Sequence, residues 1–137
     1  MPEFGQNTAR RKADALQLVQ ARVAEVRRAY ITELPGQDMI YLAKEQEAQA
    51  YLAADPEPVD LAPFPFIAGE IGTTGQTAYE VAQVFANLAG LWRAAGAALE
   101  AVRMSGPAAL EACTTPAEVA AALAAILAEI EALQPAI

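Results

Sequence analysis

The sequence contains no histidine and only one cysteine, Cys113, among its 137 residues. Without histidine there is no Cys/His nucleophile pair and no ordinary His/Cys zinc site, and a single cysteine forms no disulfide within the chain. Cys113 stands in "EACTTP", just before a predicted helix start, where we expect a small, half-buried turn residue. A disulfide to another subunit is the alternative.

Acidic pairs at catalytic or metal-binding spacing are also missing. Glu45 and Glu47 are two residues apart on a predicted helix, so their side chains point in different directions, and the same holds for Glu129 and Glu131. The acidic residues of "DPEPVD" lack EF-hand spacing, and no Gly-Lys-Ser/Thr follows "GTTGQT". We therefore expect a protein that is not an enzyme, with no catalytic residues, cofactor, metal or small-molecule substrate.

A secretory signal and a convincing membrane span are absent as well. The N-terminus lacks a basic segment followed by an apolar one, so synthesis and residence in the cytoplasm is the default expectation. Residues 81–99 have the length of a span and a single charge, Arg93, but Gln83, Asn87 and many alanines contribute little insertion energy. We expect a buried helix here and no membrane partner.

Basic residues are scarce and confined largely to the N-terminal end. Residues 1–30 hold six basic and three acidic groups, whereas residues 31–137 hold three basic and fourteen acidic ones, which gives the net charge of −8. No aromatic or glycine residue separates the basic groups of "ARRK" and "RR", as nucleic-acid platforms require. We expect no nucleic-acid binding; these residues suit a solvated helix face that can pair with an acidic helix of the same or another copy.

Helical spacing dominates the first half of the chain. Apolar residues spaced three and four apart predict a helix over about Thr8–Leu34 that ends at "LPG", and a second helix over about Gln37–Ala53, which would form an antiparallel hairpin in residues 1–54. We expect "LPGQDMIYLAKEQEAQAYLA" to be a joint whose aromatic side chains pack and whose charged side chains face water. The first seam consists of Leu16, Val19, Val23, Val26 and Tyr30.

A connector rich in proline and glycine is expected over residues 55–76. Four prolines between Asp55 and Pro65 prevent a continuous helix or a central strand. Phe64, Phe66 and Ile67 should anchor the segment on the helices, and Pro65 should begin a short helical turn that ends near Glu70.

Two further helices are predicted in residues 77–137. Thr77 and Glu80 form a capping box before a helix that should stop at Ser105–Pro107, and Thr115 with Pro116 begins the last helix. The seam of the longer helix includes Val81, Phe85, Leu88, Trp92, Ala95, Leu99 and Val102, and that of the last one Val119, Leu123, Ile126, Ile130, Leu133 and Ile137.

The predicted fold is therefore all-α, a helical bundle or coiled-coil-like assembly of heptad-patterned helices around a proline-rich linker. One chain of this size need not bury all three seams, so self-association is expected, although heptads alone do not fix the copy number. A bundle within one chain remains the alternative.

The ordered set of motifs resembles a group of small phage and prophage tail proteins. The resemblance rests on the helix stop, then Gly36, Gln37, Tyr41, Lys44, Glu47 and Ala48, then "PFPFIAGEIGTTG", and then an alanine-rich helix with Trp92. It implies a structural component of a tail, tail fibre or baseplate that binds itself and other phage tail proteins, located in the virion after synthesis in the host cytoplasm. A tail-fibre assembly chaperone, or a small cytoplasmic adaptor that binds a partner helix, is the alternative.

Overall fold

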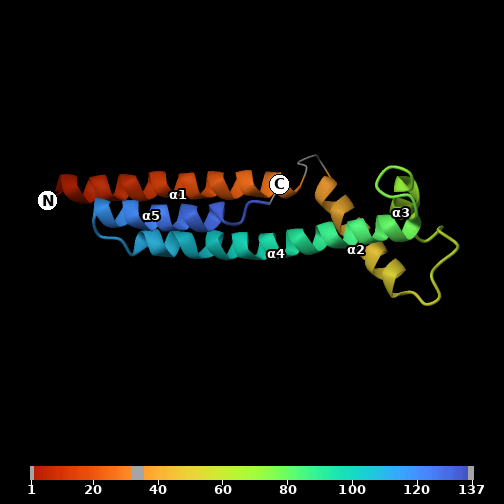
Figure 1. The fold of residues 1–137 in the computed structure, drawn as a ribbon. Helices are drawn as coiled ribbons and strands as arrows, with labels where there is room; N and C mark the ends of the chain where they lie inside the picture. Colours follow the sequence, from red (N-terminus) through yellow and green to blue (C-terminus); the bar gives the residue numbers. More distant parts are fainter. Residues whose placement is uncertain (1, 32–35, 136–137) are drawn as a thin grey trace. The chain divides into compact units, whose positions relative to one another are not determined.

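The computed structural model describes residues 2–31 and 36–135, with side chains from residue 7 onward. Over this part of the chain the all-α prediction is confirmed. The helices are α1 (Pro2–Tyr30), α2 (Gln37–Ala53), α3 (Pro65–Glu70), α4 (Ala78–Glu111) and α5 (Pro116–Glu131) (Figure 1). The described residues contain no strand, and their only β-type pairing is an isolated bridge between Ile71 and Gly75. None of the helices is long and apolar enough to cross a membrane, as far as the chain is described.

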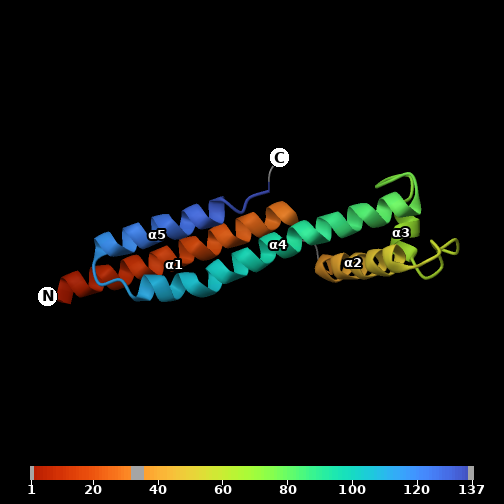
Figure 2. The same ribbon diagram turned by 60° about the horizontal axis from the view of Figure 1, so that its bottom comes forward.

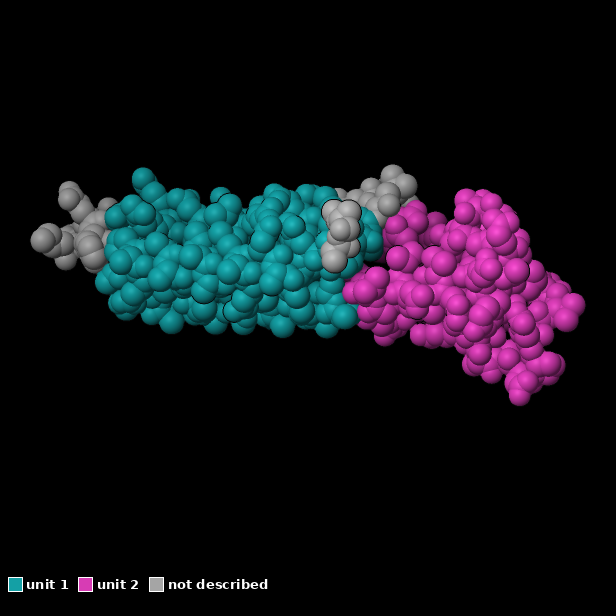
Figure 3. Space-filling view, viewed as in Figure 1, with its two compact units in different colours: residues 1–31, 94–137 teal, residues 32–93 magenta. Residues whose placement is uncertain are grey.

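The chain divides into two compact units (Figure 3). Unit 1 consists of residues 1–31 and 94–137, and unit 2 of residues 32–93. Helix α4 contributes residues 78–93 to unit 2 and residues 94–111 to unit 1. These units cut across the three segments expected from the sequence, because α1 and α2 belong to different units.

Unit 1 is a three-helix bundle. Helix α1 lies beside α5, and the second part of α4 runs alongside them in both views (Figures 1 and 2). The four- and three-residue steps from Val19 to Val23 and Val26 place these side chains on one face of α1, where each is at most 2% exposed. The core residues are Ala15, Val19, Val23, Val26, Leu99, Val102, Leu110, Cys113, Val119, Ile126 and Ile130.

Helix α4 continues through Ser105–Pro107, where the sequence predicted a stop, so that prediction was wrong. Pro107 has no N–H to donate to the preceding turn, which weakens the helix locally. The apolar face nevertheless continues on both sides of it, because Val102 is 7% and Leu110 2% exposed in the same core as Leu99. Tertiary burial of this face holds the helix together.

Gly106 lies inside α4 directly before Pro107, where a helical conformation is disfavoured for other residues because their Cβ and N–H meet the proline Cδ. A Cβ built at Gly106 would lie 3.7 Å from Val19 Cγ1 and 3.8 Å from two Ile126 carbons, which is ordinary van der Waals contact. The neighbouring helices therefore leave room for the methyl group, but Pro107 does not, and Gly106→Ala should lower the free energy of unfolding by about 1 kcal/mol. Urea denaturation measures the change, and a gain in stability would show that α4 accommodates the methyl group before Pro107.

Unit 2 packs α2, α3 and the first part of α4 around its own core. Phe64 and Ile67 are buried and Phe66 is partly buried, so the predicted anchoring of the proline-rich segment is confirmed. The Phe64 ring meets the ring of Tyr51 edge to face, with centroids 5.4 Å apart. The core residues are Ala48, Tyr51, Phe64, Ile67, Val81, Ala82 and Phe85.

Both predicted capping threonines are confirmed. The side chain of Thr77 accepts a hydrogen bond from the Glu80 N–H at 3.1 Å, and that of Thr115 accepts one from the Glu118 N–H at 3.1 Å. In each case the glutamate reaches back to the residue before the cap: Gln76 N–H donates to Glu80, and Thr114 N–H donates to Glu118. These local bonds fix where α4 and α5 begin.

Other helix limits agree with the sequence in part. The predicted limits of α2 and α3 are confirmed. The predicted start of the first helix at Thr8 was wrong, because α1 begins at Pro2 and buries Thr8, which is 6% exposed. The helix ends at Tyr30, and Leu34 and Pro35 of the predicted stop lie outside the described residues, as does Ile137. Gly36 has φ of +78°, a conformation that favours glycine.

Candidate functional site

Most of the predicted oligomer seam lies inside the chain's own units. The residues at most 7% exposed are Val19, Val23, Val26, Val81, Phe85, Leu99, Val119, Ile126 and Ile130. Leu16, Tyr30, Trp92 and Leu123 are of intermediate exposure. Because the nine buried side chains already pack within their own units, a partner could reach them only after a unit had opened. Leu88 is the exception, at 60% exposed.

An uncharged exposed face of α4 surrounds Leu88 in unit 2. Leu91 follows one turn later and is 61% exposed, so the two leucines are neighbours on the helix surface. The other exposed residues between Val81 and Trp92 are Gln83, Asn87 and Gly90. We call Leu88, Leu91 and the two amide residues Gln83 and Asn87 the α4 face; Gly90, two residues from Leu88, points away from it. The seam predicted from the sequence left out Leu91, because it used a four-residue step from Leu88 to Trp92.

Charged side chains of α2 make tertiary contacts, so the prediction that they face water was wrong. Lys44 Nζ lies 2.5 Å from a Glu70 carboxylate oxygen and 5.0 Å from the centroid of the Phe85 ring. Thr74 Oγ1 also donates to Glu70. Burial raises the pKa of Glu70, but the hydrogen bonds from Lys44 and Thr74 outweigh it and hold the pKa below its ordinary value.

Glu45 is the most buried carboxylate among the described residues, at 9% exposed. Arg93 Nε donates to Glu45 Oε1, and the side-chain amide of Gln49 donates to the same oxygen at 3.2 Å. The Arg93 side chain itself is 65% exposed. This pair ties α2 to α4 within unit 2, with its carboxylate end shielded and its guanidinium end in solvent.

Glu47 supplies a cap for α3 from another helix. The N–H groups of Phe66 and Ile67 donate to the Glu47 carboxylate at 3.1–3.2 Å. These are the second and third residues of α3, whose own preceding residue, Phe64, forms no side-chain cap. Glu47 therefore satisfies donors that a short helix leaves open at its start.

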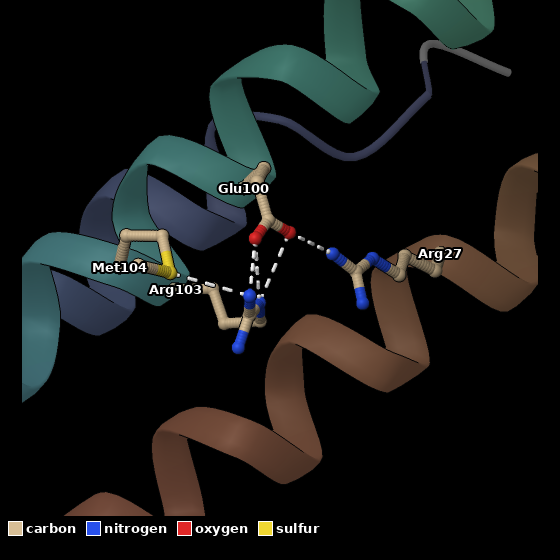
Figure 4. A network of polar contacts seen from close by, with 4 residues as sticks. All are labelled: Arg27, Glu100, Arg103 and Met104. Carbon is tan, nitrogen blue, oxygen red and sulfur yellow. Dashed lines mark hydrogen bonds and ion pairs between the residues drawn. The ribbon is translucent and has the colours of Figure 1, made fainter.

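Ion pairs in unit 1 join α1 to α4 and α5. Glu100 accepts hydrogen bonds from Arg103 on its own helix and from Arg27 of α1 (Figure 4). These hydrogen bonds, that of Arg103 first, lower the pKa of Glu100. Arg22 of α1 pairs with Glu131 of α5. Because these ion pairs are partly exposed, they orient the helices more than they stabilise unit 1.

A shallow groove of about 610 Å³ lies in unit 1 between α1 and the end of α4. Its lining residues are Thr8, Ala9, Lys12, Ala13, Leu16, Pro107, Leu110, Glu111, Cys113 and Thr114. Lys12 Nζ donates to the Glu111 carbonyl oxygen at 2.8 Å, so its charge is engaged. Cys113 is buried in the turn before α5, and its thiol lies 3.4 Å from the Ala109 carbonyl oxygen.

Titration of Tyr51 should be shifted to high pH. Burial first, and then the hydrogen bond to Glu57 at 2.5 Å, raise the pKa of Tyr51 to about 12 from 10.0. Because the unfolded state loses this proton first, stability should fall as the pH rises from about 10 to about 12. Tyr51→Phe should remove that step from the phenolate absorbance titration, and a Tyr51 that titrates near 10 would contradict the prediction.

The arrangement offers surfaces for protein contact. No group of three or more metal-ligating side chains comes together in the described part of the chain. No protein-family model, curated protein or solved structure matches the chain.

Proposed function

We propose that the chain is a non-enzymatic structural component of a bacteriophage tail, tail fibre or baseplate, which docks on a larger protein through a helix face. The ordered motifs from Gly36 to Trp92 support the phage setting by resemblance. The α4 face is the observation that carries the docking role. It exposes two neighbouring leucines in a region without charge, although unit 2 is strongly acidic.

The α4 face suits an apolar partner. Single exposed leucines are common on protein surfaces, but two leucines one turn apart, bordered on this face by the amides Asn87 and Gln83, form a continuous apolar ridge. A partner helix or sheet edge could therefore pack its apolar side chains on these two leucines.

We also propose self-association, but through other residues than the predicted seams. The heptad spacing supports coiled-coil-like packing, and most of the side chains at these positions are already buried within each unit. Copies of the chain would therefore meet through exposed residues and leave the buried seams closed. The segment from Pro56 to Pro65 would serve as a stiff connector in the assembled tail.

A tail-fibre assembly chaperone or small adaptor is the alternative function. The groove in unit 1 favours it, because Ala9, Ala13, Leu16, Pro107 and Leu110 give it an apolar lining that a partner helix could enter. Such a protein would leave before the particle is complete.

Particle composition separates the two functions. An antibody against the chain should detect it in purified phage particles at a fixed ratio to the major tail protein. Leu88→Asp with Leu91→Asp should abolish this incorporation, whereas Gln83→Asp, on the same face but outside the leucine ridge, should weaken it less. Detection only in the lysate, and never in particles, would favour the chaperone and contradict the structural role.

A further inference from the structure

Excess negative charge is concentrated in one of the two units. Unit 2 contains nine acidic against two basic residues, net −7, while unit 1 contains eight acidic against seven basic ones, net −1. Both cations of unit 2 are engaged, Lys44 with Glu70 and Arg93 with Glu45. Unit 2 therefore presents an almost uncompensated anionic surface.

Two arginines of unit 1 have no partner among the residues that the structure describes. Arg10 and Arg11 are exposed on α1, and neither makes an ion pair or hydrogen bond with any described residue. The other basic groups of α1 are engaged: Lys12 with Glu111, and Arg22 and Arg27 with carboxylates of α5 and α4. Arg28 also has an interaction. Within the described part of the chain, free positive charge thus remains at the start of α1.

Exposed apolar side chains accompany both charged regions. Leu18, 45% exposed, lies two turns after Arg11 on α1. At the start of α2, Met39 and Leu42 are 74% and 52% exposed and lie beside the exposed Asp38, which makes no ion pair with a described residue. We call Arg10, Arg11 and Leu18 the α1 patch, and Asp38, Met39 and Leu42 the α2 patch.

We propose that a second copy of this chain docks its α1 patch on the α2 patch. The two patches differ in sign and each adds apolar surface, so charge pairing would orient the copies while the leucines and the methionine lose contact with water. Because the patches are different surfaces, the contact is heterologous and each copy keeps one patch free for the next. Association would therefore continue head to tail into a ring or filament.

This inference deepens the proposed function by naming the partner and polarity of self-association, and it rests on that function only for its biological setting. An isologous contact between two acidic units is disfavoured, since two bodies of net −7 would repel each other. Salt weakens this charge pairing, because the Debye length, the distance over which exposed charges interact, falls from about 30 Å at 0.01 M to about 3 Å at 1 M ionic strength.

Light scattering over a concentration series at low and high salt tests the proposal. At low salt the full chain should exceed its monomer mass of 14.4 kDa, and added salt should return it toward that mass. Arg10→Glu with Arg11→Glu, and separately Asp38→Lys with Met39→Lys, should each weaken association by on the order of tenfold or more. An equimolar mixture of the two variants should recover association, because every junction then joins opposite charges.

Glu129→Lys is the matched control, since this exposed carboxylate of α5 makes no ion pair with a described residue and lies in neither patch. It should associate like the unaltered chain. Salt-independent association, an equal effect of Glu129→Lys, or a monomer at every concentration would each overturn the proposal. The chain could still be found in particles in any of these cases, so failure of this inference is distinguishable from failure of the structural role.

Discussion

Leu99→Ala is expected to lower the free energy of unfolding by about 2–5 kcal/mol. Leu99 is 0% exposed and lies in the core of unit 1 with Val19, Val102 and Ile126. Truncation removes buried apolar surface and leaves a cavity that the three helices can only partly close. Urea denaturation followed by circular dichroism measures the loss.

Leu88→Ala is the matched control on the same helix. Leu88 belongs to the same predicted seam but is 60% exposed, so its truncation should change stability by no more than about 0.5 kcal/mol. The loss caused by Leu99→Ala should also be independent of protein concentration, because the contacts lie within one chain. Equal effects at the two positions, or a loss that varies with concentration, would mean that the seam is buried between copies.

The features that the sequence predicted correctly depend on local interactions. The limits of α2 and α3 and the caps at Thr77 and Thr115 follow from bonds and breakers within a few residues. The stop at Ser105–Pro107 failed for the opposite reason. Gly106 packs close to Val19 and Ile126, and contacts so distant in sequence outweigh the local weakness at Pro107.

Candidate site features were harder to predict because their partners are far along the chain. The sequence predicted that Lys44, Glu45 and Glu47 face water. Their partners are Glu70, Arg93 and the start of α3, and no pattern near these three residues indicates such distant contacts. Heptad spacing identified buried side chains in both units. It could not say whether they would be buried by the same chain or by another, because both arrangements use the same spacing.

Glu47→Ala is expected to destabilise unit 2 by about 1–3 kcal/mol, because it leaves the N–H groups of Phe66 and Ile67 without their acceptor. Ile67 is 0% exposed, so loosening the start of α3 disturbs a core residue as well as a cap. Amide hydrogen exchange should show faster exchange at these two N–H groups, and urea denaturation should show the loss of stability.

Two variants separate this cap from a general effect on α2. Glu47→Gln keeps one acceptor oxygen and should retain part of the protection at Phe66 and Ile67, at a smaller loss of stability. Gln46→Ala alters the exposed neighbouring position and should leave both amides protected. If Glu47→Ala neither accelerated exchange at these amides nor lowered stability relative to Gln46→Ala, α3 would be held by the packing of Phe64 and Ile67 alone. The Glu47 carboxylate would then contribute little to holding the proline-rich segment against α2.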